Sequence, residues 1–353
     1  MKKIISIASF FLIVTSCIKL GVDPKVPPAN FTIGGGVLFV DEGNFRSGNG
    51  SLSFYSYDSS KVFNDLFYEK NQRPLGDVPN SIALKEDKIF IIVNNSGKIE
   101  VIDQATAESK ATISGLISPR NMAFINDNKA YVTSLYSDSL AIINLSLNSV
   151  SGYINLRRTS ETIAVAGNEA FIANWVGGKE IMVVNTLLDK VVDSIEVGIE
   201  PESITIDRKL RLWVLSNGGW SRENFAKLQA INISTHKVEK TYVFPNKQAS
   251  PTSLTIDGIG QTLFYLEKGV RQMDIEAVNL PGAPLIPEDA GSTYYKLAVN
   301  PINSDIFVTD VLDYVQPGFI HIYKNDGSFV GKYKTGIIPG ALCFKLRIDT
   351  QAK

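Results

Sequence analysis

The sequence predicts an all-β chain, a seven-bladed β-propeller with four-stranded blades, in which the C-terminal inner strand pairs with N-terminal strands to close the ring. Three observations predict this fold. A short motif recurs seven times, each copy is followed by the same succession of apolar runs and polar turns, and the last copy lacks strands that residues 36–68 supply.

The recurring motif is a seven-residue segment that ends in a short, largely apolar run, as in VPNSIAL (78–84) and SPRNMAF (118–124). In every copy a large apolar residue, such as Ile82, is followed by a small one, such as Ala83. This order fits an inner strand that is crowded near a central axis. Aligned on their second residue, the copies begin about 40–50 residues apart, at Pro79, Pro119, Ser160, Pro201, Pro251, Tyr294 and Pro339.

Each copy continues in the same way. After VPNSIAL come the polar turn KEDK (85–88), the apolar run IFIIV (89–93), a loop, and a third run KIEVID (98–103), and a shorter fourth run completes the unit. A single sheet of this kind would expose apolar side chains on both faces, so it is not stable alone. Stacking such sheets around an axis buries both faces, which favours a propeller.

The two ends of the chain complete each other. IPGALCF (338–344) begins a blade, but the chain stops soon after it. The missing strands are predicted in GVLFVDEG (36–43), GSLSFYSYD (50–58) and KVFNDLFY (61–68). Pairing across this seam fixes the number of blades at seven, whereas the alternative, an open solenoid, leaves these ends unmatched.

The N-terminus reads as a lipoprotein signal peptide over residues 1–16: MKK, an apolar stretch, and VTSC ending at Cys17. Cys17 is the predicted lipidation site, with an ordinary signal peptide that happens to contain a cysteine as the alternative. Residues 17–33, with two consecutive prolines, are the lipid anchor and flexible tether. The propeller is expected over 34–346, followed by a C-terminal tail over 347–353.

Composition excludes several classes of function. The net charge is −1, which gives no general affinity for nucleic acid. Apart from Cys17 the only cysteine is Cys343, inside an apolar stretch, where a small buried side chain is expected. The two histidines, His236 in a turn and His321 in a strand, supply neither a nucleophile triad nor a zinc site. We therefore expect a protein that is not an enzyme and has no cofactor and no metal site.

The loops between the second and third strands carry aromatic and amide side chains, whereas the turns between the first and second strands are short and charged. Aromatic rings interleaved with amides are typical of a contact surface. The predicted ligand-binding residues in these loops are Asn44, Phe45, Asn95, Tyr136, Asn174, Trp175, Trp220, Asp313 and Tyr314. Alternatively, each ring covers the top of its own blade.

The inner strands contribute a second predicted ring of site residues near the central mouth, a natural floor for a ligand. This ring comprises Asn80, Arg120, Glu161, Glu202 and Tyr295. Arg120 and Glu161 come from neighbouring copies of the motif, so a simple neutralising ion pair between them is the alternative to a role in binding.

Two longer segments, AYVTSLYSDSLAIINL (130–145) and DKVVDSIEVGIEPESITID (189–207), resemble the YVTN-type repeats of bacterial seven-bladed propellers. More narrowly, GSLSFYSYD, PLGDVPNSIAL, IIVNNSGKIEVID, LWVLSNGG, FVTDVLDYVQPGFIHIY and GIIPGALCFK resemble a family of propeller lipoproteins from gut Gram-negative bacteria. The resemblance covers residues 34–346.

This resemblance implies a function. Members of that family capture cobalamin and related corrinoids and pass them to a TonB-dependent outer-membrane transporter. The expected protein is therefore an outer-membrane lipoprotein at the cell surface that binds a small molecule such as cobalamin, touches the membrane only through its lipid anchor, and binds no nucleic acid. Residence on the periplasmic side is the alternative location. The alternative functions are a protein- or glycan-docking scaffold at the cell envelope and a calcium-dependent lactone hydrolase-like propeller.

Overall fold

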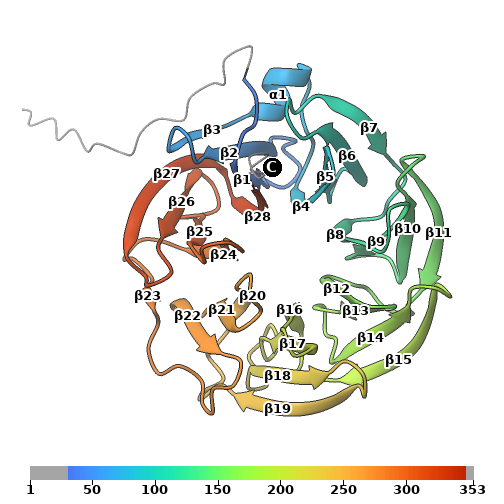
Figure 1. Ribbon diagram of the computed structural model, residues 1–353, viewed down its shortest axis with the longest axis vertical. Coiled ribbons are helices and arrows are strands. Elements are labelled where there is room, and N and C mark those ends of the chain that lie inside the picture. The colour runs from blue at the N-terminus through green and yellow to red at the C-terminus, as the bar shows by residue number, and fades with distance from the viewer. Residues whose placement is uncertain (1–30, 347–353) are drawn as a thin grey trace, which may run out of the picture.

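The computed structural model describes residues 31–346, and these form seven four-stranded antiparallel sheets arranged as blades around a central axis (Figure 1). The predicted propeller is confirmed. Signal peptide 1–16, Cys17, most of the tether and tail 347–353 lie outside the described residues. Between residues 31 and 346, none of the helical structure is long and apolar enough to cross a bilayer.

Blades are numbered here in chain order. Blade 1 consists of β28 (Pro339–Lys345), β1 (Gly36–Asp41), β2 (Ser51–Ser56) and β3 (Lys61–Phe63). Blade 2 consists of β4 (Pro79–Lys85), β5 (Lys88–Val93), β6 (Lys98–Asp103) and β7 (Ser109–Ile113). Blade 3 consists of β8 (Pro119–Phe124), β9 (Lys129–Ser134), β10 (Ser139–Asn144) and β11 (Ser149–Asn155). Blade 4 consists of β12 (Ile163–Ala166), β13 (Glu169–Ala173), β14 (Glu180–Asn185) and β15 (Lys190–Glu196).

The remaining blades follow the same order from the axis outward. Blade 5 consists of β16 (Pro201–Ile206), β17 (Arg211–Ser216), β18 (Lys227–Asn232) and β19 (Lys237–Val243). Blade 6 consists of β20 (Thr252–Ile256), β21 (Thr262–Leu266), β22 (Gly269–Asp274) and β23 (Ile286–Pro287). Blade 7 consists of β24 (Tyr294–Val299), β25 (Ile306–Asp310), β26 (Pro317–Tyr323) and β27 (Phe329–Ile337).

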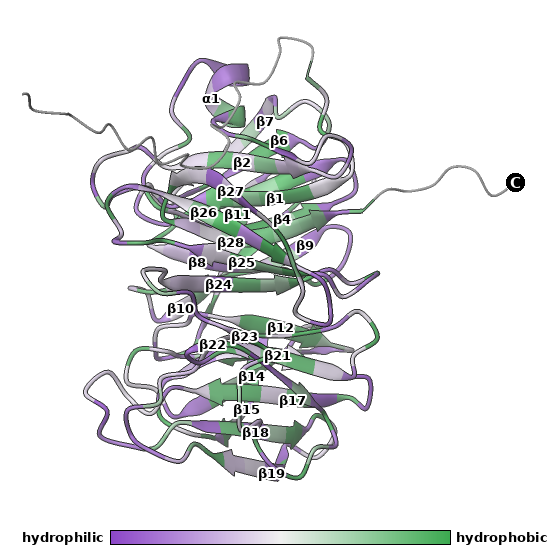
Figure 2. Cartoon of the chain, turned by 90° about the vertical axis from the view of Figure 1, so that its left-hand side faces the viewer, coloured by the Kyte–Doolittle hydropathy of each residue, from purple (hydrophilic) through white to green (hydrophobic). Residues whose placement is uncertain are grey.

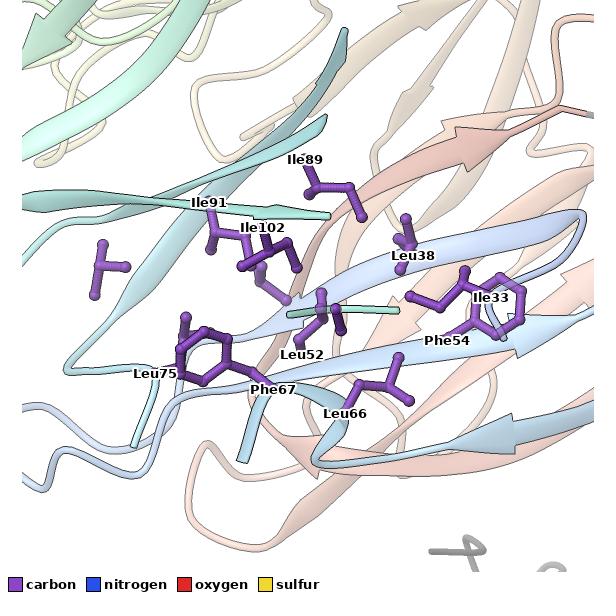
Figure 3. Packing of buried hydrophobic residues seen from close by; sticks show 13 residues of the cluster. Ile33, Leu38, Leu52, Phe54, Leu66, Phe67, Leu75, Ile89, Ile91 and Ile102 are labelled. Carbon is purple, nitrogen blue, oxygen red and sulfur yellow. The ribbon is translucent and has the colours of Figure 1, made fainter. Parts of the chain in front are cut away.

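Apolar side chains on both faces of each sheet hold the ring together. The described residues form seven buried clusters, and each cluster combines side chains from two neighbouring blades. Figure 3 shows the cluster between blades 1 and 2, where Leu38 and Leu52 face Ile89 and Ile91. Seen edge-on, hydrophobic residues follow the strands and hydrophilic ones gather in the loops (Figure 2). No blade is therefore an independent unit.

The predicted seam is present. β1 pairs with β28 antiparallel, with Leu38 opposite Cys343 and Asp41 opposite Pro339. The cluster between blades 7 and 1 also crosses it, because Phe39 of β1 packs with Phe307 of β25. Cys343 is half-buried rather than fully buried, and burial raises the pKa of its thiol to about 12, which is unlike a nucleophile.

One predicted strand is wrong in part. KVFNDLFY was predicted as a strand over 61–68, but β3 ends at Phe63 and helix α1 (Leu66–Asn71) follows. Asp65 has a left-handed backbone (φ 56°), which ends the extended conformation. The helix then buries Leu66 and Phe67 in the cluster between blades 1 and 2. The burial of Leu66 and Phe67 therefore favours a helix at this point over a continued strand.

His236 joins the outer parts of blades 4 and 5. It lies in the turn before β19, where Nδ1 is 2.7 Å from Asp193 Oδ2 and Nε2 is 3.2 Å from Glu169 Oε2. Partial burial opposes protonation of the ring, but the hydrogen bonds and charges of Asp193 and Glu169 outweigh it, so the pKa of His236 is raised above its ordinary value of 6.5.

This contact predicts a pH-dependent contribution to stability. Because the pKa is higher in the folded state than in the unfolded one, the contribution is complete below pH 6.5 and is lost as the pH rises through the folded-state pKa. We expect His236→Gln to lower the free energy of unfolding by about 1 kcal/mol at pH 5.5 and by clearly less at pH 9. Urea titrations of both proteins at the two pH values measure this; equal differences would show that the ion pairs contribute nothing.

Candidate functional site

One face of the ring carries both the loops between second and third strands and the connections between blades; we call it the loop face. Main-chain hydrogen bonds tie these two sets of segments together. Asn94 N–H donates to Val78 C=O at 2.8 Å, Leu135 to Ser118 at 3.0 Å, and Asn217 to Glu200 at 3.1 Å. The predicted aromatic loops and the starts of the inner strands therefore share a face.

The residue before the inner strand has a left-handed backbone in four blades, at Val78, Ser118, Glu200 and Ile338. A β-branched residue rarely adopts positive φ, so Val78 and Ile338 are strained. In each of these blades the carbonyl of the left-handed residue itself accepts an N–H from the second strand or from the loop that follows it. This repeated backbone conformation thus holds the loops between the second and third strands next to the starts of the inner strands.

Arg120 and Glu161 form a buried ion pair at the mouth of the channel. Arg120 Nε donates to both carboxylate oxygens of Glu161 at 2.9 Å, and the two side chains are only 17% and 11% exposed. The neutralising pair considered from the sequence is therefore present. Glu202 is also engaged, since it accepts the N–H of Ser253 at 2.9 Å and lies 4.0 Å from Lys296 Nζ.

Glu42 joins this group from a loop and was missed from the sequence. Its carboxylate accepts the hydroxyl of Tyr295 at 3.0 Å. Burial raises its pKa, although the charges of Lys296 and Arg120 oppose the shift. A Cβ atom on Gly340 would lie 3.0 Å from Glu42 Oε1, so Glu42 occupies the space that blade 1 leaves at its inner strand. Gly340 and Glu42 are 298 positions apart in the sequence, so no local sequence pattern indicates that they meet.

We call these residues the mouth cluster: Glu42, Arg120, Glu161, Glu202, Tyr295 and Lys296. It contains three carboxyl groups and two cations. Burial and the charge of Glu42 raise the pKa of the Tyr295 hydroxyl, so it remains a hydrogen-bond donor near neutral pH.

In three blades, side chains of the inner-strand segment hold the backbone of the mouth residue in the next blade. Asn80 Nδ2 and Ser81 Oγ both donate to the carbonyl of Arg120, at 3.0 and 2.6 Å. Asn121 Nδ2 donates to the carbonyl of Glu161 at 2.9 Å, and Ser253 Oγ to that of Tyr295 at 3.3 Å. Asn80, a predicted ligand contact, thus holds the backbone of its neighbour with its amide nitrogen.

We call the exposed aromatic side chains of the loop face, Phe45, Tyr136, Trp220 and Tyr314, the aromatic rim. The rim adjoins the mouth cluster at the seam between blades 7 and 1. The rings of Tyr295 and Tyr314 meet edge to face with centroids 5.9 Å apart, and Asn44 Nδ2 donates to the carbonyl of Tyr314 at 3.1 Å. Phe45 follows Asn44 and is 62% exposed, with the guanidinium of Arg46 over its ring. Four predicted site residues, Asn44, Phe45, Tyr295 and Tyr314, are therefore brought together.

Other predicted loop residues differ in exposure. Trp220 and Tyr136 are 78% and 76% exposed and are free to contact a ligand. Trp175 is half-buried and its Nε1 is buried without a hydrogen-bond partner among the described residues. Asn174 is buried and accepts from Thr159 Oγ1 and from the N–H of Val176, so it shapes its own loop. The ring of Trp175 is thus less accessible to a ligand than those of Trp220 and Tyr136.

The last two predicted residues bond to loop segments of the protein itself. Asn95 donates a short hydrogen bond to Asp77. Asp313 accepts the N–H groups of Val315 and Gln316 at 3.0 Å, which lowers its carboxyl pKa and forms a turn. Both side chains are exposed, but no contact connects either to the mouth cluster.

The fold and the mouth cluster define a class, a seven-bladed β-propeller with a polar channel mouth beneath an aromatic rim. Residues 35–333 match the family described as Domain of unknown function (DUF5074), and the chain belongs to this family. A comparison with curated proteins found no match.

Solved structures with the same fold have different titles and low identity. A quinonprotein alcohol dehydrogenase-like protein from Bacteroides thetaiotaomicron is 14% identical with a TM-score of 0.69, and the match covers 89% of this chain and 79% of that one. Hydrazine synthase from Kuenenia stuttgartiensis is 15% identical with a TM-score of 0.61, covering 74% and 88%. The computationally designed protein Ika8 is 12% identical with a TM-score of 0.60, covering 89% and 93%. At such identities the similarity establishes the fold alone.

Proposed function

We propose that this chain is a lipid-anchored ligand-binding propeller that holds a corrinoid, such as cobalamin, on its loop face. The observation that carries the proposal is the continuity of the mouth cluster with the exposed rings of Tyr314 and Phe45. A corrin macrocycle is broad and edged with amides. It suits a wide face that combines aromatic contact area with carboxyl, amide and cationic groups.

The proposed role is capture without catalysis. All three mouth carboxyl groups have protein partners: Glu42 the hydroxyl of Tyr295, Glu161 the guanidinium of Arg120, and Glu202 the N–H of Ser253. This favours a preformed binding surface over a calcium-dependent hydrolase. The corrinoid would then pass to a TonB-dependent outer-membrane transporter, with the membrane reached through acyl chains on Cys17. A protein- or glycan-docking scaffold is the alternative, and it predicts no tight binding of a small molecule.

Isothermal titration calorimetry of the purified protein with cyanocobalamin tests the proposal. We expect saturable one-to-one binding with a dissociation constant of about 1 μM or lower, equivalent to roughly −8 kcal/mol. Absence of saturable heat up to the solubility limit of cyanocobalamin would reject the corrinoid and leave the scaffold.

Trp220 is the loop residue whose replacement separates binding from stability best. Because its side chain is 78% exposed, Trp220→Ala should leave the melting temperature within about 1 °C of wild type. If the ring stacks on the ligand, the same change should weaken cyanocobalamin binding by about 2 kcal/mol, or roughly thirtyfold. Trp175→Ala is the contrasting variant: its half-buried ring predicts a lower melting temperature. If Trp220→Ala binds cyanocobalamin as tightly as wild type, blade 5 does not take part in the binding site.

A further inference from the structure

The last residue of the second strand departs from the repeat in blades 1 and 7. It is Asp41 at the end of β1 and Asp310 at the end of β25, and both side chains are fully buried. The other five second strands end in uncharged residues, which are Val93, Ser134, Ala173, Ser216 and Leu266. Burying an ionisable group costs free energy unless it is hydrogen-bonded, so the contacts of these two aspartates indicate their role.

Asp310 joins two segments of the loop face. Its Oδ1 accepts the N–H of Thr293 at 2.8 Å and the N–H of Leu312 at 3.1 Å. Thr293 directly precedes β24, and Leu312 lies in the loop that follows β25. Two more bonds join the same segments, because Val311 N–H donates to the carbonyl of Thr293 at 3.0 Å and Thr293 Oγ1 donates to that of Leu312 at 2.7 Å. Asp310 therefore holds the start of β24 against the loop at 311–316.

These two segments carry the aromatic residues of the site at the seam. Tyr295 is the second residue of β24 and Tyr314 lies in the loop, and their rings meet edge to face with centroids 5.9 Å apart. The N–H of Tyr314 donates to the carbonyl of Val311 at 3.0 Å, so the turn that carries Tyr314 starts within the bonded segment. Since Asp310 is itself buried, it acts on a ligand only through the groups that it holds.

Basic side chains hold the other oxygen of this carboxylate. Asp310 Oδ2 is 3.2 Å from His321 Nε2 and 3.3 Å from Lys332 Nζ. Burial opposes ionisation, but the hydrogen bonds from His321, Thr293 and Leu312 outweigh it, so the pKa of Asp310 lies well below its ordinary value of 3.8. An ionised carboxylate is a stronger acceptor than a neutral group, which strengthens its bonds to the two main-chain N–H groups.

Asp41 makes a similar attachment on the other side of the seam. Its Oδ1 accepts the N–H of Gly336 in β27 at 3.0 Å. A Cβ atom on Gly336 would lie 2.6 Å from Asp41 Cγ, so this close approach requires a glycine. The base of the loop at 42–49 is thereby attached to blade 7. Asn44 in that loop donates to the carbonyl of Tyr314, so both loops meet at the seam.

We propose that Asp310 is a positioning residue of the ligand site, which sets Tyr314 against Tyr295 and so preorganises the part of the site at the seam. The proposal rests on the proposed function for its ligand, whereas the positioning of the two rings can be measured without one. A site whose contact groups are already held in place loses less conformational entropy on binding. Loosening the loop at 311–316 should therefore weaken binding, although no group that touches the ligand is removed.

Isothermal titration calorimetry with cyanocobalamin compares Asp310→Ala with the matched control Asp207→Ala. Asp207 is also buried and also accepts two main-chain N–H groups, those of Lys209 and Arg211, but it lies in the turn after β16 on the opposite face. We expect at least tenfold weaker binding in Asp310→Ala and unchanged binding in Asp207→Ala, even where both variants have a lower melting temperature. Equal losses in the two variants, or no loss in Asp310→Ala, would overturn the proposal.

A double-variant cycle shows whether Asp310 acts through Tyr314. If it does, Asp310→Ala/Tyr314→Ala should bind cyanocobalamin no more weakly than Tyr314→Ala alone, whereas additive losses would contradict the proposal. Should Asp310→Ala fail to fold, Thr293→Val provides the same test, because it removes only the hydroxyl bond to Leu312. We then expect about threefold weaker binding, and no further loss when Tyr314 is already replaced.

Nuclear Overhauser effects between selectively labelled tyrosine rings measure the positioning without a ligand. We expect a cross-peak between Tyr295 and Tyr314 in the wild-type protein and its loss in Asp310→Ala, with the cross-peak kept in Asp207→Ala. A cross-peak that persists in Asp310→Ala would overturn the proposal. If the wild-type protein shows the cross-peak but does not bind cyanocobalamin, the proposed function fails and the positioning by Asp310 does not.

Discussion

Replacing Arg120 by methionine is expected to lower the free energy of unfolding by about 3–5 kcal/mol, because it leaves the carboxylate of Glu161 buried and unpaired. The pair is almost enclosed, and Arg120 makes three contacts of 2.7–2.9 Å with Glu161. Urea denaturation at pH 7 measures the change.

The double variant Arg120→Met/Glu161→Met is the control for this prediction. Removing both charges removes the desolvation penalty as well, so most of the lost stability should return. If the single variant is as stable as wild type, Glu161 must reach water, and the mouth would be far more open than the structure shows.

Ending the chain at Ile338 is expected to abolish cooperative folding. The truncation removes β28 and with it the β1–β28 ladder, the packing of Leu342 and Phe344 between blades 7 and 1, and that of Ala341 between blades 1 and 2. Full burial of a leucine or phenylalanine contributes about 1.5–3 kcal/mol, and the partly buried Leu342 and Phe344 contribute toward the lower end of that range. With the ladder included, the loss exceeds about 5 kcal/mol, which is comparable to the whole stability of many domains.

Thermal unfolding followed by circular dichroism checks this, with a chain ending at Leu346 as the matched control. We expect a single sharp transition for the control and a broad or absent one for the shorter chain. A cooperative transition near the same temperature in both would mean that the ring does not depend on its seam.

The sequence predicts the ring well because one repeated physical requirement specifies it. Each inner strand needs a large residue followed by a small one, and the spacing of these pairs gives the number of blades. Departures from the repeat were harder to predict. Helix α1 is too short to show helical periodicity, and it forms because Leu66 and Phe67 complete a cluster whose other members are distant in the chain.

The site was predictable only where the place of a residue within the repeat determines its position in the ring. Arg120, Glu202 and Tyr295 lie at the mouth because each follows the first residue of its inner strand, where the register with the second strand shifts, and Glu161 holds the same place in the repeat just before β12. Glu42 comes from a loop and lies there because Gly340 leaves room, which no spacing rule reveals. The difference in exposure between Trp175 and Trp220 could not be predicted either. Both residues follow a second strand, and they differ only in how their loops fold.

Hydrogen–deuterium exchange with and without cyanocobalamin tests most directly whether the loop face around the mouth is the binding surface. The account predicts slower exchange in the loops at 43–49, 217–223 and 312–316, with the turns at 86–88 and 208–210 on the opposite face unchanged. Protection confined to that opposite face, or to the outer edge of blade 6, would contradict it.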